Sequence, residues 1–152
     1  MKKQNNKDKN KMQVKIKKLS SDAIIPTYAK ASDAGLDLVA TSIVSATPTQ
    51  ITYGLGISLE IPNGFMGLVF PRSSIRNYDL ALTNSVGVID SGYRGELQAT
   101  FHKTKGLESK IYEVGERVVQ IIIIPHPSIE FQEVEELTNT ERGEGGFGST
   151  GK

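Results

Sequence analysis

Apolar residues recur at every second position through much of this chain, which is the spacing of a strand with one buried face. The longest run alternates from Ile51 to Ile61, and it predicts either one half-buried strand or a bent pair of strands. Shorter alternations predict strands over residues 14–19 and around 97–101, and an apolar run predicts another over 65–70. Residues 118–124 are almost all β-branched, which predicts a strand buried on both faces.

Helical periodicity is nearly absent from the chain. No segment longer than about ten residues carries an apolar stripe of helical spacing, and the best helical candidate is a short piece around Ser74–Asn77. Many short strands between Gly/Pro turns favour a sandwich, a jelly roll or a barrel. The length of 152 residues indicates one domain.

The N-terminal segment differs from the rest in charge. Residues 1–18 hold eight lysines and one acid, a net charge of +7, which leaves −6 for the remainder of a chain whose total is +1. We expect residues 1–11 to be a disordered basic arm. The alternative is a weak, non-specific contact with nucleic acid.

Several function classes are excluded by composition. The chain has no cysteine, so disulfides, thiol catalysis and cysteine-ligated zinc are excluded. It has neither an apolar run of about 18 residues nor the apolar core of a secretory signal, so we expect no membrane span. We expect a cytoplasmic location, or the interior of the host cell if the protein is viral.

The C-terminal segment is rich in glycine. Residues 140–151 contain five glycines and almost no apolar side chains, so composition alone favours a flexible tail. The alternative is an anion-binding segment, because glycine lets backbone N–H groups approach phosphate oxygens. In that case Arg142, Ser149 and Thr150 would add donors, and Phe147 would lie over a base.

Three other segments contain candidate catalytic or binding residues. Arg72, Ser73 and Ser74 place a cation and two hydroxyls at a strand end, although an exposed turn with a serine helix cap is the alternative. Asp37 stands inside an apolar strand, where a carboxylate needs a partner. Asp90 follows an apolar run in a hairpin, and taken alone it is better explained as a turn-former. We expect His102 and His126 to be surface residues, not metal ligands.

Taken together, these segments resemble a known family. AxDAGxDL, PRSS, GVIDSGYRG, GERVVQ and RGEGGFGSTG occur in this order, and they are similar to the five motifs of the trimeric dUTPases. The likeness runs from about Val14 to Gly151. It implies an all-β domain over residues 12–139: a distorted jelly roll, or β-clip, of about eight strands with at most one short helix. It also implies a flexible C-terminal tail, residues 140–152, which closes as a lid over nucleotide.

The resemblance implies hydrolysis of dUTP to dUMP and pyrophosphate, which lowers dUTP and supplies dUMP for thymidylate synthesis. Asp90 would be the catalytic base that activates the water attacking the α-phosphorus. The uracil pocket would be formed by Asn84, Gly87, Val88, Ile89, Asp90 and Gln98. Tyr93 would pack against the deoxyribose and exclude a 2′-hydroxyl.

The same resemblance implies the phosphate contacts, the metal and the assembly. The α- and β-phosphates would be held by Arg72, Ser73, Ser74 and Gln120, and the tail residues closing over the nucleotide would be Arg142, Phe147, Gly148, Ser149 and Thr150. Mg²⁺ would be held mainly by the triphosphate and by waters, with Asp37 binding those waters. The chain would form a homotrimer in which three copies share each active site.

Two other functions compete with dUTP hydrolysis. A dCTP deaminase shares the fold, but it carries a general-base glutamate where this chain has Thr100. A regulatory binding protein on the same scaffold is the second alternative; an inactive version should have lost Asp90, Tyr93 or the tail, and all are present. Three positions depart from the common motifs, Gly92, Glu116 and the pair Val118-Val119, and none of them is assigned chemistry.

Overall fold

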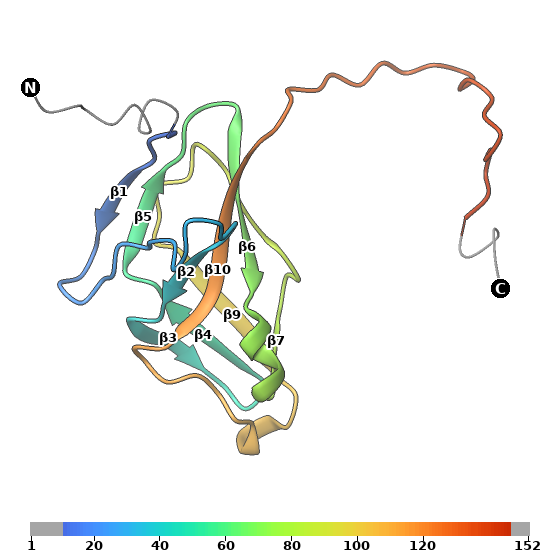
Figure 1. The fold of residues 1–152 in the computed structure, drawn as a ribbon. Coiled ribbons are helices and arrows are strands. Elements are labelled where there is room, and N and C mark those ends of the chain that lie inside the picture. The colour runs from blue at the N-terminus through green and yellow to red at the C-terminus, as the bar shows by residue number, and fades with distance from the viewer. Residues whose placement is uncertain (1–10, 147–152) are drawn as a thin grey trace, which may run out of the picture.

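The computed structural model describes residues 11–146 of the chain, and within them ten strands form three antiparallel sheets (Figure 1). One four-stranded sheet has the order β2 (Leu36–Val39), β10 (Arg117–Pro125), β6 (Phe65–Pro71), β8 (Gly87–Ile89). The other has the order β3 (Ser42–Ala46), β4 (Gln50–Gly54), β9 (Gln98–Lys103), β7 (Leu80–Leu82). The small third sheet pairs β1 (Lys15–Lys18) with β5 (Ile57–Glu60).

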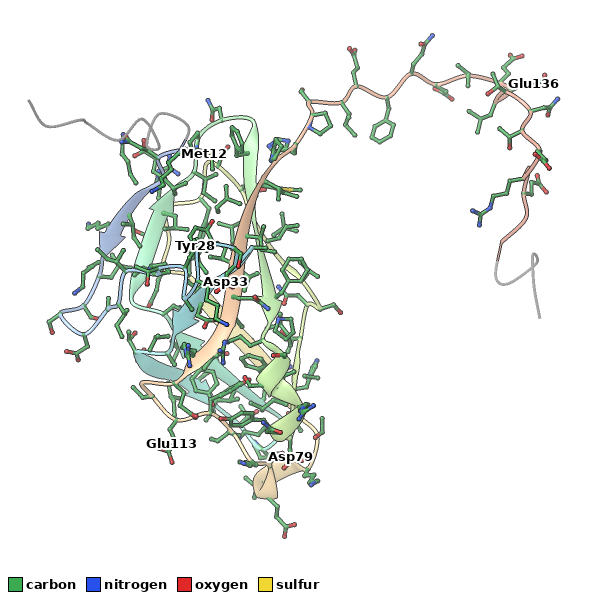
Figure 2. The ribbon with its side chains drawn as sticks, in the orientation of Figure 1. Met12, Tyr28, Asp33, Asp79, Glu113 and Glu136 are labelled. Carbon is green, nitrogen blue, oxygen red and sulfur yellow. The ribbon has the colours of Figure 1, made fainter. Side chains whose placement is uncertain are left out.

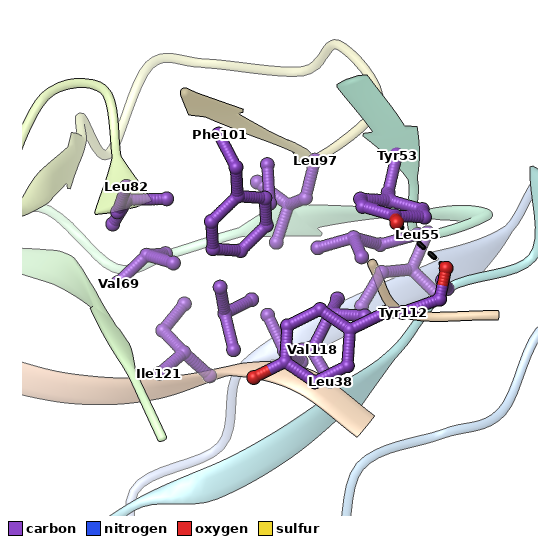
Figure 3. Packing of buried hydrophobic residues seen from close by; sticks show 14 of the residues in the cluster. Leu38, Tyr53, Leu55, Val69, Leu82, Leu97, Phe101, Tyr112, Val118 and Ile121 are labelled. Atoms are coloured by element: carbon purple, nitrogen blue, oxygen red, sulfur yellow. Dashed lines mark hydrogen bonds between the residues drawn. The ribbon is translucent and has the colours of Figure 1, made fainter. Parts of the chain in front are cut away.

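A single apolar core joins the two larger sheets. Leu38, Val69 and Ile121 come from the first sheet and pack in one cluster with residues of the second sheet, as Figure 3 shows for Tyr53 and Phe101. The buried Tyr53 hydroxyl donates a hydrogen bond of 2.7 Å to the carbonyl oxygen of Tyr112, so this polar atom is satisfied inside the core.

The long alternation from Ile51 to Ile61 is a bent pair of strands, the second of the two predicted forms. All six of its apolar residues are buried, but the chain leaves one sheet after β4 and enters another as β5. The bend falls at Gly56, whose φ of +66° lies in the left-handed region that favours glycine. The two halves therefore share a buried face while they belong to different sheets.

The all-β class is confirmed, with differences in detail. The structure divides the chain into ten strands where about eight were expected, partly because β3 has no buried residue and gives no alternation signal. The predicted short helix is present as η1 (Ser73–Asn77), a 3₁₀ helix. A second one, η2 (Gly106–Glu108), was not predicted. Strand β10 is buried on both faces only near its start, at Val118, Val119 and Ile121.

The segment after β10 leaves the body of the molecule. Residues 126–146 contain no strand and extend away from the sheets as an arm (Figure 1). Residues 1–10 and 147–152 lie outside the described residues, so the predictions for the basic arm and for Phe147, Gly148, Ser149 and Thr150 are not tested. No helix within residues 11–146 is long and apolar enough to cross a membrane.

Candidate active site

A pocket of about 660 Å³ gathers residues from three separate sequence motifs. It lies between the loop of residues 27–35 and the ends of β2, β6 and β10. Its lining includes four residues predicted from the sequence to act on phosphate or metal: Asp37, Arg72, Ser73 and Gln120. We call it the phosphate pocket.

The partner that Asp37 requires is a pair of guanidinium groups. Arg72 Nε donates to Asp37 Oδ1 at 2.6 Å and its second nitrogen donates to Oδ2 at 3.1 Å, a bidentate arrangement. Arg117 donates to the same Oδ2 at 3.2 Å. Two guanidinium groups therefore surround the Asp37 carboxylate, and a second carboxylate, that of Asp33, also lines the pocket.

The side chain of Gln120 is fixed by close packing. Its amide nitrogen donates to the carbonyl oxygen of Pro71 at 3.0 Å. In the loop just before β2, a Cβ atom at Gly35 would lie 2.5 Å from the Gln120 side-chain oxygen, so a larger residue there would displace this side chain. An amide nitrogen carries two hydrogens, and the second remains for a ligand.

The two serines of the phosphate pocket region do not cap η1, so the helix-cap alternative is wrong. The cap residue is Arg72, and no side chain makes a capping hydrogen bond. Ser73 is exposed, and Ser74 Oγ accepts a hydrogen bond from Arg72 at 3.0 Å. Neither the Ser73 hydroxyl nor the Ser74 hydroxyl is therefore used to cap η1.

A second, smaller pocket of about 130 Å³ lies at the turn that joins β7 to β8, two strands of different sheets, and we call it the hairpin pocket. Five residues predicted to bind the base line it: Asn84, Gly87, Val88, Ile89 and Gln98. Ser85 in the hairpin turn has a φ of +58°, a left-handed conformation that costs free energy for a residue other than glycine. Such strain is concentrated at ligand sites, and here it follows directly on Asn84.

Asp90 follows the last residue of β8 and is exposed to solvent. It opens a turn through its backbone, because the N–H of Tyr93 donates to the Asp90 carbonyl oxygen at 3.1 Å. Its carboxylate makes no hydrogen bond or ion pair to any residue between 11 and 146. The side chain is therefore not what forms the turn, and it is free to bind a ligand or a water.

The ring of Tyr93 lies against Gly95. A Cβ atom at Gly95 would overlap the ring and hydroxyl of Tyr93, and that hydroxyl donates to the carbonyl oxygen of Glu96 at 3.0 Å. Glycine at this position therefore sets where the half-exposed ring stands beside Asp90.

Some site residues were not predicted. Arg117 was quoted in the motif GERVVQ but given no role, although a basic residue directly before the predicted buried strand 118–124 was a usable signal. The loop residues Thr27, Ala29 and Asp33 also line the phosphate pocket. Asp33 accepts from the backbone N–H of Lys30 at 2.9 Å and so shapes this loop. Arg142 lies on the arm, bonded to the carbonyl oxygen of Gly145 at 3.0 Å, and lines neither pocket.

The described residues offer no ready-made metal cage. No group of three or more His, Asp or Glu side chains converges anywhere in the described part of the chain. His102 and His126 are both exposed, as expected from the sequence. A carboxylate has about four lone-pair sites, of which Asp37 has three occupied by arginines, so one remains for a metal-bound water. This donor set fits a cation held chiefly by a ligand's phosphates.

Comparison with known proteins identifies the family. Residues 21–151 match the family model described as dUTPase. The chain belongs to the dUTPase family. It is 41% identical to the deoxyuridine 5′-triphosphate nucleotidohydrolase of Crocosphaera subtropica over 142 residues, which are 92% of this chain and 99% of that protein. It is also 41% identical to the enzyme of that name from Nautilia profundicola over 145 residues, 93% of this chain and 100% of the relative.

A solved structure is similar throughout the fold. The dUTPase of Staphylococcus bacteriophage 80alpha with dUPNHPP superposes with a TM-score of 0.82 at 28% identity, and covers 92% of this chain and 99% of its own. The predicted family, fold class and dUTPase activity are therefore confirmed. Members of this family generally depend on a divalent metal ion.

Proposed function

We propose that this chain hydrolyses dUTP to dUMP and pyrophosphate by attack of water on the α-phosphorus, with Asp90 as the general base. One observation carries the residue assignment: a carboxylate without any bond to the described residues follows directly on the strand that lines the hairpin pocket. A base of this kind accepts a proton from water as the oxygen–phosphorus bond forms, and pyrophosphate leaves with the electron pair of the broken bond.

The hairpin pocket would recognise uracil through its backbone and two amides. Gly87, Val88 and Ile89 offer main-chain donors and acceptors, and Asn84 and Gln98 offer side-chain amides. This set of donors and acceptors would match uracil. Cytosine has an exocyclic amine where uracil has a carbonyl, and the amine would leave buried polar groups of the pocket unpaired. The volume of about 130 Å³ suits a single small base.

The phosphate pocket would hold the triphosphate. Donors are supplied by Arg72, Ser73 and Gln120, which line the pocket, and by Ser74, which is hydrogen-bonded to Arg72. Mg²⁺ bound to the phosphates would neutralise part of their charge in the transition state. Asp37 would orient water next to that ion through its one remaining lone pair.

The active site would be shared by three copies of the chain. The phosphate pocket and the hairpin pocket of one chain have no lining residue in common, which supports a site in which one copy recognises the base and another binds the phosphates. The tail beyond Arg142 would close over a third copy's nucleotide and contribute Phe147, Gly148, Ser149 and Thr150. A homotrimer brings these parts together.

Exposed apolar side chains on the arm support this assembly. Phe131 is 92% exposed and Leu137 is 86% exposed, and Ile129 and Val134 are exposed with them. Figure 2 shows Glu136 on the arm, far from the body that carries Tyr28 and Asp33. An apolar groove of about 400 Å³, lined by Val14, Ile25, Tyr28 and Ile123 among others, offers a surface of matching character on a neighbouring copy. Burial of such side chains favours association.

The decisive experiment is a pyrophosphate-release assay with dUTP, dCTP, dTTP and UTP in the presence of Mg²⁺. We expect release from dUTP alone, and loss of that release when the metal is chelated. Ammonia released from dCTP would show a deaminase, and binding of dUTP without any turnover would show a regulatory protein.

Gly95→Ala is expected to lower kcat/KM for dUTP about tenfold. It should also lower the ratio of kcat/KM for dUTP to kcat/KM for UTP. The added methyl group would displace the Tyr93 ring, which is proposed to pack against the deoxyribose. The matched control in the same turn is Gly92→Ala, because a Cβ atom at Gly92 has no neighbour within 4 Å. Equal kinetics for the two variants would contradict the placement of Tyr93.

A further inference from the structure

Glu96 carries a partly buried carboxylate that the proposed mechanism does not use. The residue lies between the turn that Asp90 opens and strand β9, and it lines neither pocket. Its Oε1 accepts a hydrogen bond of 2.8 Å from the backbone N–H of Gly56, which is 40 positions away in the chain. Gly56 stands at the bend between β4 and β5 (Figure 1). The Glu96 side chain therefore ties the segment after Asp90 to this bend.

The backbone of the bend leaves room for this carboxylate. A Cβ atom at Gly54 would lie 2.8 Å from Glu96 Oε1, so a larger residue there would meet the carboxylate. Within residues 11–146, Glu96 forms no ion pair, and the Gly56 N–H is the donor that its carboxylate receives. A hydrogen bond to an ionised acceptor is stronger than one between neutral groups. The bond to Gly56 is therefore what fixes the direction of the side chain.

The peptide group between Glu96 and Leu97 is held by the same bend. The N–H of Leu97 donates to the carbonyl oxygen of Ile57 at 2.9 Å, and the carbonyl oxygen of Leu97 accepts from the N–H of Leu55 at 3.0 Å. The bend therefore holds this peptide group through the backbone on one side and through the Glu96 side chain on the other.

The carbonyl end of that peptide group receives Tyr93. The Tyr93 hydroxyl donates to the Glu96 carbonyl oxygen at 3.0 Å. Tyr93 is 45% exposed, so the direction of its ring depends on this bond and on its contact with Gly95. A shift of the Glu96 carbonyl group would therefore move the ring.

We propose that Glu96 is a positioning residue for Tyr93. Its carboxylate ties the peptide group that receives the Tyr93 hydroxyl to the bend at Gly56, and so sets where the ring stands beside the sugar. This inference rests on the proposed function, in which Tyr93 packs against the deoxyribose and excludes a 2′-hydroxyl. The quantity that Glu96 controls is the ratio of kcat/KM for dUTP to kcat/KM for UTP.

The test compares two conservative variants of Glu96 in the full-length protein. Glu96→Asp keeps the charge, but its side chain is one methylene shorter and does not reach the Gly56 N–H from the same backbone position. It should lower the dUTP-to-UTP ratio of kcat/KM about threefold, the effect of one weakened hydrogen bond. Glu96→Gln loses the charge but keeps the length and an accepting oxygen, so it should keep the ratio. An unchanged ratio in Glu96→Asp, or an equal loss in Glu96→Gln, would overturn the proposal.

Amide hydrogen exchange tests the bond to the bend without any turnover. The Gly56 N–H should exchange about threefold faster in Glu96→Asp than in the wild type, and at the wild-type rate in Glu96→Gln. Equal exchange at Gly56 in all three proteins would overturn the proposal. Absence of dUTP hydrolysis in the wild type would instead reject the proposed function, so the two failures are distinguishable.

A matched control separates positioning from general stability. Asp79 also accepts a hydrogen bond from a distant backbone N–H, that of Lys110 at 2.9 Å, and it lines neither pocket. Asp79→Ala should lower the midpoint of thermal unfolding and leave the dUTP-to-UTP ratio of kcat/KM unchanged. A ratio lowered equally by Asp79→Ala and by Glu96→Asp would show that destabilisation causes the effect, and it would overturn the role of Glu96 in placing Tyr93.

Discussion

Asp90→Asn is expected to lower kcat for dUTP hydrolysis by about a hundredfold or more, within the range that general-base catalysis contributes. The amide has nearly the shape of the carboxylate, but it does not take a proton from water. Nucleotide affinity should be retained, because Asp90 would contact the base through its unchanged backbone and the phosphate contacts are made by other residues. Pyrophosphate release gives kcat, and calorimetric titration with a non-hydrolysable dUTP analogue gives affinity.

The control for this variant is Asp22→Asn. Asp22 is an exposed carboxylate whose hydrogen bond comes from Ser21, its neighbour in the chain, and it lines neither pocket. Its loss of charge should leave turnover unchanged. Turnover of Asp90→Asn close to the wild-type value would remove Asp90 from the mechanism, whatever the result for binding.

Deletion of residues 142–152 is expected to lower kcat about a hundredfold while the protein remains a trimer. The deletion removes the Arg142 guanidinium, the donors of Ser149 and Thr150 and the Phe147 ring, all proposed to close over bound nucleotide. Loss of a single preorganised donor can cost as much, and an open site also admits water. The apolar residues of the arm up to Leu137 remain, so association should persist.

A deletion of similar length at the other terminus provides the comparison. Removing residues 1–10 takes away the lysine-rich segment, which has no proposed part in hydrolysis, and should leave kcat unchanged. Mass by light scattering monitors the trimer in both proteins. An unaffected rate after the C-terminal deletion would contradict the lid, and dissociation into monomers would show that the tail serves assembly.

Strand positions followed from the sequence where one face is buried. Between Ile51 and Ile61 every second residue is apolar, because the pleat of a strand sends successive side chains to opposite faces. All six of these apolar side chains are buried. Three strands could not be predicted from such an alternation. Strand β3 lies at a sheet edge with every residue exposed, so packing imposes no pattern on it. Strands β7 and β8 have three residues each, too few for a period to be recognised.

The candidate site was predictable in its residues but not in its contacts. A carboxylate in an apolar strand predicted that Asp37 has a partner, yet nothing local indicated Arg72, which is 35 positions away. Arg117 joins the same carboxylate because β10 pairs with β2, and strand pairing across 80 positions is not encoded in either segment alone. The serine-cap alternative is wrong, because the cap residue of η1 is Arg72, and Ser74 accepts a hydrogen bond from that arginine.

The separation of the two pockets has a genetic consequence. Because they share no residue, a defect in the hairpin pocket region of one copy leaves its phosphate pocket intact, and the reverse also holds. A chain with Asp90→Asn and a chain with Arg72→Gln would each be inactive alone. Refolded together into mixed trimers, they would form about one site in four with both parts undamaged. Two null alleles of this kind would complement each other within one cell.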